Sequence, residues 1–280
     1  DQGLRFKKMK EAEAMIMEDM PVVPIFHYTQ PYLVKENVKG ILIPSEEETI
    51  QMYPMDYEEF LWAFDYNDAD ILRESFLQKK PFNEIFHKEF IDHFRYYLAL
   101  GGMPKVLSTF LETKDFYAVE REKRKIISLY ENDLKKFDSD FKTSCYLVWK
   151  QIPSMLSKHS TRFIAKAVNE RADSFHFQNT IDKLAESKIV IPVYKCTDPT
   201  GGFALTKDET MFKLYLNDIG LFVSLIYSNS DNDVNDIYKK IIFDKLGMNL
   251  GMLYENLVAQ SLLVNNFTPY YYSWSSKNDN

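Results

Sequence analysis

Gly101 and Gly102, followed by Pro104, form the stretch of this sequence whose residue types could bring the backbone close to a ligand. Two glycines end a helix because glycine is the poorest helix former after proline. Pro104 suits the first turn of a following helix, where its missing N–H costs no hydrogen bond. Two interpretations stay open: a corner that only shapes the fold, or a tight turn that lets a nucleotide approach the backbone.

Groups that could catalyse a reaction or bind a metal are scattered along the sequence. Glu58 and Glu59 are adjacent, and adjacent positions on a helix point about 100° apart, so we expect them to be surface charges. His87 and His93 lack the i, i+4 spacing of a helical zinc site. We therefore predict no catalytic residue and no metal-binding residue.

A phosphate-binding loop requires the pattern G-x-x-x-x-G-K-[ST], in which backbone amides and the lysine hold the phosphates. No Gly-Lys dipeptide occurs in the 280 residues, and no hydrophobic strand ends in the paired acids that hold Mg²⁺. We therefore expect that this chain does not hydrolyse ATP by itself.

The composition bounds the class of protein. Hydrophobic residues make up 45% of the chain and aromatic residues 15%, which is enough for a packed core. A net charge of −7 argues against a broadly basic nucleic-acid surface. We expect Cys145 and Cys196 to be buried, reduced thiols. Because no apolar run reaches the roughly 18 residues of a membrane helix, we expect no membrane partner and a cytoplasmic location.

The elements that must position the glycine pair are mainly helical. Asp56 and Glu59 form a capping-box pattern at the start of a helix, preceded by a short strand at Ile50 to Met55. Helices are predicted over 68–78 and 83–98, and a long charged helix runs from about Asp115. This helix carries a cluster of basic residues, here called the basic shoulder: Arg121, Lys123, Arg124 and Lys125. The basic shoulder is either a solvated face or a contact for phosphate or an acidic partner.

Residues 141–216 have the pattern of a winged helix. A helix at 144–157 and a second at 172–187 precede two strands at 189–196 and 211–218. The second helix would present the side chains that contact DNA or a protein partner, namely Arg171, Gln178, Asn179 and Lys183. It also carries Asp173, Asp182 and Glu186, so its charge is nearly balanced. We favour contact with protein, and DNA contact remains the alternative.

Three segments carry a resemblance to a known family: LALGGMPKVLSTFLETKDF, MYPMDYEEFLWA upstream and FKLYLNDIGLF downstream. Together they resemble bacterial and archaeal AAA-type P-loop ATPases of the domain of unknown function 4143 type, over about residues 48–276. In that family a P-loop core comes first, and here it would precede Glu48. The resemblance implies that Gly101, Gly102 and Pro104 contact adenine, and that ATP and Mg²⁺ bind tightly only in the full-length family member.

The same resemblance implies how the chain is divided. The fold class is mainly α with small β elements (α+β). Glu255 matches a helix glutamate of the family's nuclease-like tail, whose other metal ligands would lie beyond Asn280. The expected domains are an importer-like fragment at 1–45, a helical lid at 46–138, a winged helix at 139–228 and the start of a truncated nuclease-like α/β tail at 229–280.

The first 43 residues look different from the rest. EAEAMIMEDMPVVPIFHYTQPYLVKENVKGILI is similar to the C-terminal end of oligopeptide-binding proteins of ABC importers. The peptide-binding lobes of that family are missing, so we expect a chimeric junction between about Pro44 and Glu48.

The sequence thus predicts a lid and winged-helix fragment of an AAA-type ATP-binding protein, with a protein partner or self-association. A winged-helix module that binds DNA or protein is the alternative. A peptide-binding component of an ABC importer is the third hypothesis.

Overall fold

The computed structural model describes residues 52–66, 69–81, 83–136, 145–157, 174–227, 233–243 and 250–273. The chain divides into two compact units, residues 1–51 and residues 52–280, and every described element belongs to the second. The predicted helix and strands of the first 43 residues lie outside the described residues. The second unit is mainly helical with one small sheet, so the predicted fold class is confirmed.

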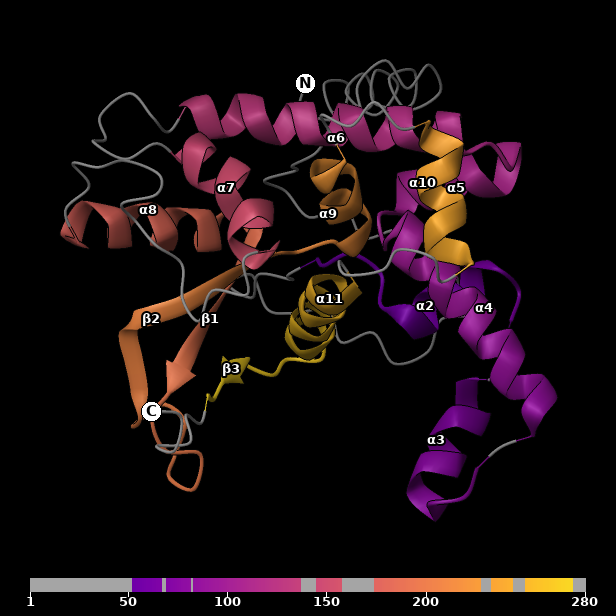
Figure 1. The fold of residues 1–280 in the computed structure, drawn as a ribbon, viewed down its shortest axis with the longest axis horizontal. Helices are drawn as coiled ribbons and strands as arrows, with labels where there is room; N and C mark the ends of the chain where they lie inside the picture. Colours follow the sequence, from indigo (N-terminus) through magenta and orange to yellow (C-terminus); the bar gives the residue numbers. More distant parts are fainter. Residues whose placement is uncertain are drawn as a thin grey trace, which may run out of the picture. The chain divides into compact units, whose positions relative to one another are not determined.

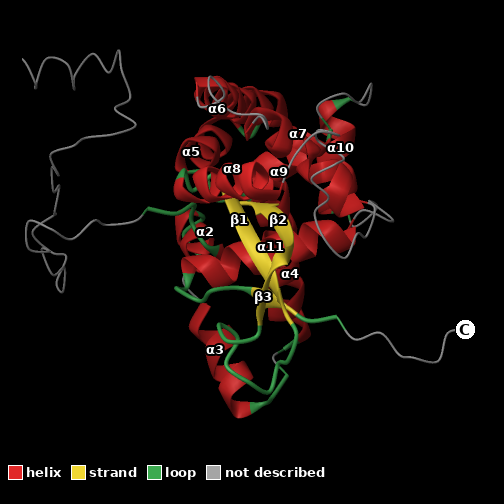
Figure 2. Ribbon diagram, turned by 90° about the vertical axis from the view of Figure 1, so that its left-hand side faces the viewer, coloured by secondary structure: helices red, strands yellow, loops and turns green. Residues whose placement is uncertain are grey.

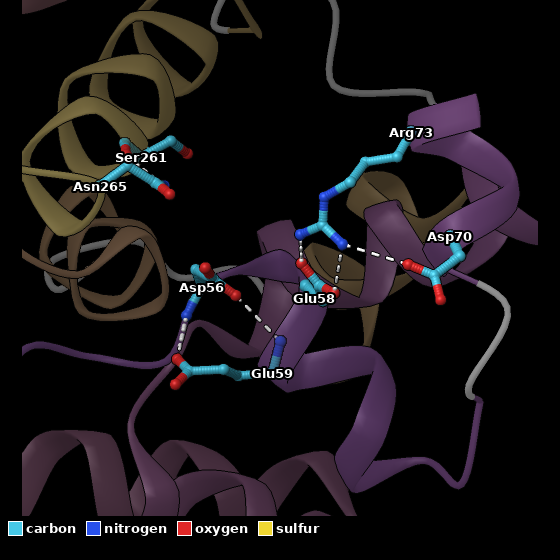
Figure 3. Close-up of polar contacts among 7 residues, drawn as sticks. All are labelled: Asp56, Glu58, Glu59, Asp70, Arg73, Ser261 and Asn265. Atoms are coloured by element: carbon cyan, nitrogen blue, oxygen red, sulfur yellow. Dashed lines mark hydrogen bonds and ion pairs between the residues drawn. The ribbon is translucent and has the colours of Figure 1, made fainter. Parts of the chain in front are cut away.

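The N-terminal half of this unit is built from helices, and the first of them begins at a clear sequence signal. Asp56 caps α2 through the predicted capping box, in which its side chain accepts from the Glu59 amide and Glu59 accepts from the Asp56 amide. The close-up in Figure 3 shows both hydrogen bonds. The helices are α2 (Tyr57–Ala63), α3 (Ala69–Gln78), α4 (Glu84–Leu100), α5 (Pro104–Thr113) and α6 (Phe116–Lys136).

The sheet has the strand order β2-β1-β3. Strands β1 (Val190–Cys196) and β2 (Lys207–Leu216) pair antiparallel, with an irregularity between Tyr194 and Lys195. Strand β3 (Tyr270–Tyr271) is very short and pairs parallel with β1. The two long strands are close to the predicted ones.

Helix α9 (Ile219–Ile226) lies at the centre of the unit. Its residues from Ile219 to Leu225 are all buried, and it packs against α4, α6, α7, α11 and β2. Figure 1 shows α9 between α6 and α11. A helix that is apolar on all sides can only be stable when neighbours cover it all round, which explains why this short segment forms the middle of the core.

The remaining helices surround this centre. They are α7 (Cys145–Ser157), α8 (Ser174–Glu186), α10 (Val234–Ile242) and α11 (Leu250–Val264). Helix α8 packs on β1 and α7, while α11 packs on both long strands and on α9 (Figure 2). Both cysteines, Cys145 and Cys196, are buried and free, as predicted. Among the residues that the structure describes, no helix is long and apolar enough to cross a membrane.

Two predicted features are wrong. The described part of the expected strand at Ile50 to Met55 forms no strand; the Met55 N–H instead donates to the Gly102 carbonyl at 2.8 Å. Lys123 does not belong to a basic shoulder, because its side chain is completely buried. In addition, the polar composition of residues 228–236 predicts a loop, but helix α10 begins within them at Val234, with Asp233 as its N-cap.

Candidate functional site

The glycine pair forms a corner at which distant segments meet backbone to backbone. Gly101 ends α4 with a φ of +81°, a conformation that favours glycine, and Pro104 begins α5 at the first helical position. A Cβ on Gly102 would lie 2.1 Å from the Met55 carbonyl oxygen. A Cβ on Gly220 would lie 2.2 Å from the Leu100 carbonyl oxygen. Glycine is therefore required here because the backbones approach too closely for any side chain.

Asp218 joins this corner to the central helix. Its Oδ2 accepts a hydrogen bond from the Gly102 amide at 2.7 Å, and its Oδ1 accepts from the Leu221 amide at 2.8 Å, which caps α9. The side chain is fully buried, and burial raises the pKa of its carboxyl, while the backbone hydrogen bonds and nearby Lys123 oppose that rise.

Lys123 enters the same region from α6. Its Nζ donates to the Ala99 carbonyl in the last turn of α4 and lies 4.9 Å from the ring centroid of Tyr238. Burial lowers the pKa of this ammonium to about 8, although Glu120 and Asp218 favour its charged form. The carbonyl end of a helix is a favourable place for a cation, so Lys123 completes the end of α4.

Helix α11 contributes two buried amides to the same region. The Gln260 Oε1 accepts from the Ile219 amide at 2.9 Å, and its Nε2 donates to the Tyr97 hydroxyl at 3.1 Å. That hydroxyl donates to the Met55 carbonyl at 2.8 Å. The amide of Asn256 pairs with both backbone groups of Leu216. The corner is thus fixed by hydrogen bonds from four separate parts of the chain.

The three predicted adenine-contact residues are therefore in different environments. Gly101 and Gly102 are buried against Met55, Asp218 and Gly220 of the same chain. Pro104 is exposed at the start of α5. The structure brings the three together, and Pro104 is the member that a ligand can reach.

The predicted contact face of α8 is partly occupied by the chain itself. Gln178 Nε2 donates to Asp182 at 3.0 Å and to the Tyr194 hydroxyl at 3.1 Å. Asn179 is exposed and Lys183 is half-buried, while Arg171 lies outside the described residues. Phe177, Ile181 and Leu184 face the core. A face with this many internal contacts is better suited to packing than to reading DNA bases.

A small hollow between α2, α3 and α11 contains charged groups that pair with one another. Arg73 forms ion pairs with Glu58 and Asp70, as Figure 3 shows. Ser261 of α11 and Asn265, just after α11, also line this hollow of about 290 Å³. Because Glu58 holds Arg73 and Glu59 caps α2, the predicted surface role of both glutamates is confirmed.

A larger cleft, of about 510 Å³, lies between α11 and the sheet. Glu255 Oε2 accepts a hydrogen bond from Lys213 Nζ at 2.9 Å and another from the Tyr215 hydroxyl at 2.8 Å. Burial and the Glu255 carboxylate raise the pKa of Tyr215. No cluster of three or more metal-binding side chains occurs within the described ranges.

Sequence reasoning identified Glu255 but missed its two partners. Lys213 and Tyr215 are two residues apart on β2, and alternate residues of a strand point to the same side. That spacing predicts that Lys213 and Tyr215 share one side of β2, but their hydrogen bonds to Glu255 on α11 depend on the tertiary fold.

The described chain is thus a mainly helical domain in which a glycine corner, a small sheet and a cleft are joined by buried hydrogen bonds. A family model described as "Domain of unknown function (DUF8612)" matches residues 91–232, and the chain belongs to this family. The matched residues include the glycine corner, α8, both long strands and α9.

Two curated proteins of Bacillus subtilis (strain 168) share short stretches with the chain. The dipeptide-binding protein DppE is 32% identical over 63 residues, which is 22% of this chain and 10% of that protein. The oligopeptide-binding protein OppA is 38% identical over 48 residues, which is 17% of this chain and 9% of that protein. The chain therefore spans about a tenth of the length of these relatives. No solved structure matches the chain significantly.

Proposed function

We propose that residues 52–280 are the lid and winged-helix part of an AAA-type ATP-binding protein, which does not hydrolyse ATP by itself. The observation that carries this proposal is that the three resembling segments meet at one point. Met55 of the first segment bonds to Gly102 of the second, and Gly102 bonds to Asp218 of the third. Segments that contribute to one function are expected to converge in this way, although they are far apart in the sequence.

The geometry supports a positioning role for this corner. Lys123 and Asp218 hold the end of α4 and the start of α9, so the exposed ring of Pro104 is presented from a backbone with little freedom to move. A proline ring offers a rigid apolar face on which an adenine base can pack. Such a contact contributes binding but supplies no group for phosphoryl transfer, which requires phosphate-binding amides, a lysine and Mg²⁺.

A protein-binding winged helix is the second candidate, favoured by the internal contacts of Gln178 on α8. DNA binding by this helix would require its polar side chains to leave those partners. Electrophoretic mobility assays at increasing salt would test it, because phosphate contacts give a steep salt dependence. A cytoplasmic location and a protein partner or a second copy are part of the same proposal.

Peptide binding by an importer component receives little support. The matches to the two peptide-binding proteins cover about a tenth of each.

The test is a titration of a fluorescent ATP analogue with Mg²⁺. The 280-residue chain should show no tight binding, whereas a protein in which a P-loop core precedes residue 52 should bind. In that longer protein, Pro104→Ala should weaken binding, and Pro199→Ala, at an exposed proline in the β1–β2 loop, should not. Tight binding by the 280-residue chain alone would contradict the proposal.

A further inference from the structure

The cleft between α11 and the sheet has the size and composition of a small-molecule site. Its lining comes from α11, from all three strands and from the residues beside β3. A volume of about 510 Å³ lies within the usual range of roughly 300–1,000 Å³ for ligand pockets. None of the lining residues belongs to the glycine corner, so this cleft is a separate feature of the molecule.

Tyrosine rings form much of the wall of the cleft. Tyr254 on α11 is 41% exposed and Tyr272 beside β3 is 48% exposed, while Tyr270 and Tyr271 line the same space. One face of Tyr254 stacks on Phe94, with ring centroids 6.2 Å apart, and the Lys213 ammonium lies over the Tyr271 ring. The other face of Tyr254 and the exposed ring of Tyr272 therefore offer surfaces for stacking. At Gly251, a Cβ would meet no atom within 4 Å, which shows that this part of the wall borders open space.

The polar part of the cleft presents a donor beside an acceptor. Lys213 and Glu255 form an ion pair, and their charges cancel. Within the described part of the chain, one hydrogen bond of the Lys213 ammonium is formed, to Glu255, and an ammonium has three N–H groups. Glu255 accepts hydrogen bonds from Lys213 and Tyr215, and a carboxylate has about four acceptor positions, so it can share its acceptors among several donors. The pair is therefore neutral overall and can exchange hydrogen bonds with a ligand.

We propose that this cleft binds a planar heteroaromatic ring that carries a hydrogen-bond donor beside an acceptor on one edge, with adenine as the simplest example. The ring stacks on the tyrosines, its exocyclic amine donates to Glu255, and its neighbouring ring nitrogen accepts from Lys213. Adenine presents such a donor and acceptor side by side, at N6 and N7. A charged ring is disfavoured because the ion pair leaves no net charge for it to balance.

The probe is adenosine, titrated into the 280-residue chain and followed by NMR line shifts or calorimetry. Tyr254→Ala removes a stacking face and should weaken binding at least about fivefold, because stacking on an aromatic side chain contributes about that factor or more. Glu255→Gln keeps the shape but lowers the acceptor strength, and it should weaken binding similarly. Tyr117→Ala is the matched control, because Tyr117 is 44% exposed but lies on α6, outside the cleft.

Purine riboside, which lacks the exocyclic amine, separates edge recognition from stacking alone. Purine riboside should bind the wild type at least about fivefold more weakly than adenosine does, and this ratio should be smaller for Glu255→Gln. Circular dichroism establishes that each variant is folded, and Lys213→Met provides a second test if one variant is not.

Saturable binding that falls in the cleft variants and not in Tyr117→Ala supports the inference. The inference is overturned if adenosine shows no saturable binding at millimolar concentration. It is also overturned if the cleft variants bind as well as the wild type, or if purine riboside binds as well as adenosine. Because adenosine has no phosphate and the assay needs no P-loop core, failure here leaves the proposed role of the glycine corner untouched.

Discussion

The buried ammonium of Lys123 gives the most quantitative prediction. Burial lowers its pKa from 10.5 to about 8 in the folded protein. A shift of about 2.5 units corresponds to about 3 kcal/mol, at 1.36 kcal/mol per unit. This free energy opposes folding whenever the lysine is charged, because the folded state must hold the ammonium away from water.

The pH dependence follows from the number of protons that each state binds. Below about pH 8 both states carry the proton, and the full cost of about 3 kcal/mol is present. Between pH 8 and 10.5 the unfolded state binds more protons, so the free energy of unfolding rises with pH. Burial also raises the pKa of Tyr97, Tyr130 and Tyr238, so tyrosine ionisation in the unfolded state lowers stability above about pH 10. The useful window is therefore pH 7.5 to 9.5.

The perturbation is Lys123→Met, which keeps the length of the side chain and removes its charge. Urea unfolding followed by tryptophan fluorescence gives the free energy of unfolding at each pH. From pH 7.5 to 9.5 the wild type should gain about 2 kcal/mol relative to Lys123→Met, since about 1.5 pH units of that window lie above the lowered pKa. The variant also loses the hydrogen bond to the Ala99 carbonyl, so the test is the change of stability with pH and not the stability at one pH.

Taking the difference between the two proteins cancels the titration of other groups. The charged or titratable neighbours that act on Lys123 are Glu120, Arg124 and Asp218, and Tyr238 lies against it. Lys125→Met on the same helix is the control, because its side chain is exposed and pairs with Glu122 on the surface. Curves for the wild type and Lys123→Met that run parallel from pH 7.5 to 9.5 would refute the reasoning.

Two further predictions concern the buried contacts of the glycine corner. Gly102→Ala should lower the free energy of unfolding by at least about 2 kcal/mol, because the new Cβ would lie 2.1 Å from the Met55 carbonyl oxygen. Gly251→Ala, in open space on a helix, should be neutral or stabilising by up to about 1 kcal/mol; equal losses in both variants would contradict the close approach. Gln260→Leu should cost about 1–3 kcal/mol, because it leaves the buried Ile219 amide without its acceptor. Asn265→Leu, at the exposed end of α11, serves as its comparison, and equal stability of the two would count against the buried amide bond.

Features with a local cause could be predicted from the sequence. Gly101 ends α4, Pro104 begins α5 and Asp56 caps α2, because each depends on the conformational preference or short side chain of one residue. Asp218 likewise has the short acceptor side chain of an N-cap and caps the helix that follows it. These signals act over three or four residues, so the sequence alone carries them.

Features that depend on tertiary contacts could not be predicted. Lys123 lies in the charged run EREKRK, and only the approach of the Ala99 carbonyl from α4 makes its burial tolerable. The hydrogen bond between Gly102 and Asp218 joins residues 116 positions apart. The parallel pairing of β3 with β1 likewise depends on the position of α11, because α11 directly precedes β3 in the sequence and directs it toward the sheet.

Helix α10 is a different case, because its signals were present. Asp233 is a good N-cap, and Ile237, Tyr238 and Ile241 fall on one helical face that is buried. The polar run SNSDNDVND, which extends into the first turn of α10, concealed these signals. The pattern of the apolar residues would have revealed the helix if it had been weighed above composition.

The measurement that tests the central claim most directly is the affinity for an ATP analogue with and without a P-loop core ahead of residue 52. We expect tight, Mg²⁺-dependent binding only with the core, and weaker binding when Pro104 is replaced by alanine in that longer protein. Tight binding by the 280-residue chain alone, or no effect of Pro104→Ala, would contradict the proposed role of the glycine corner.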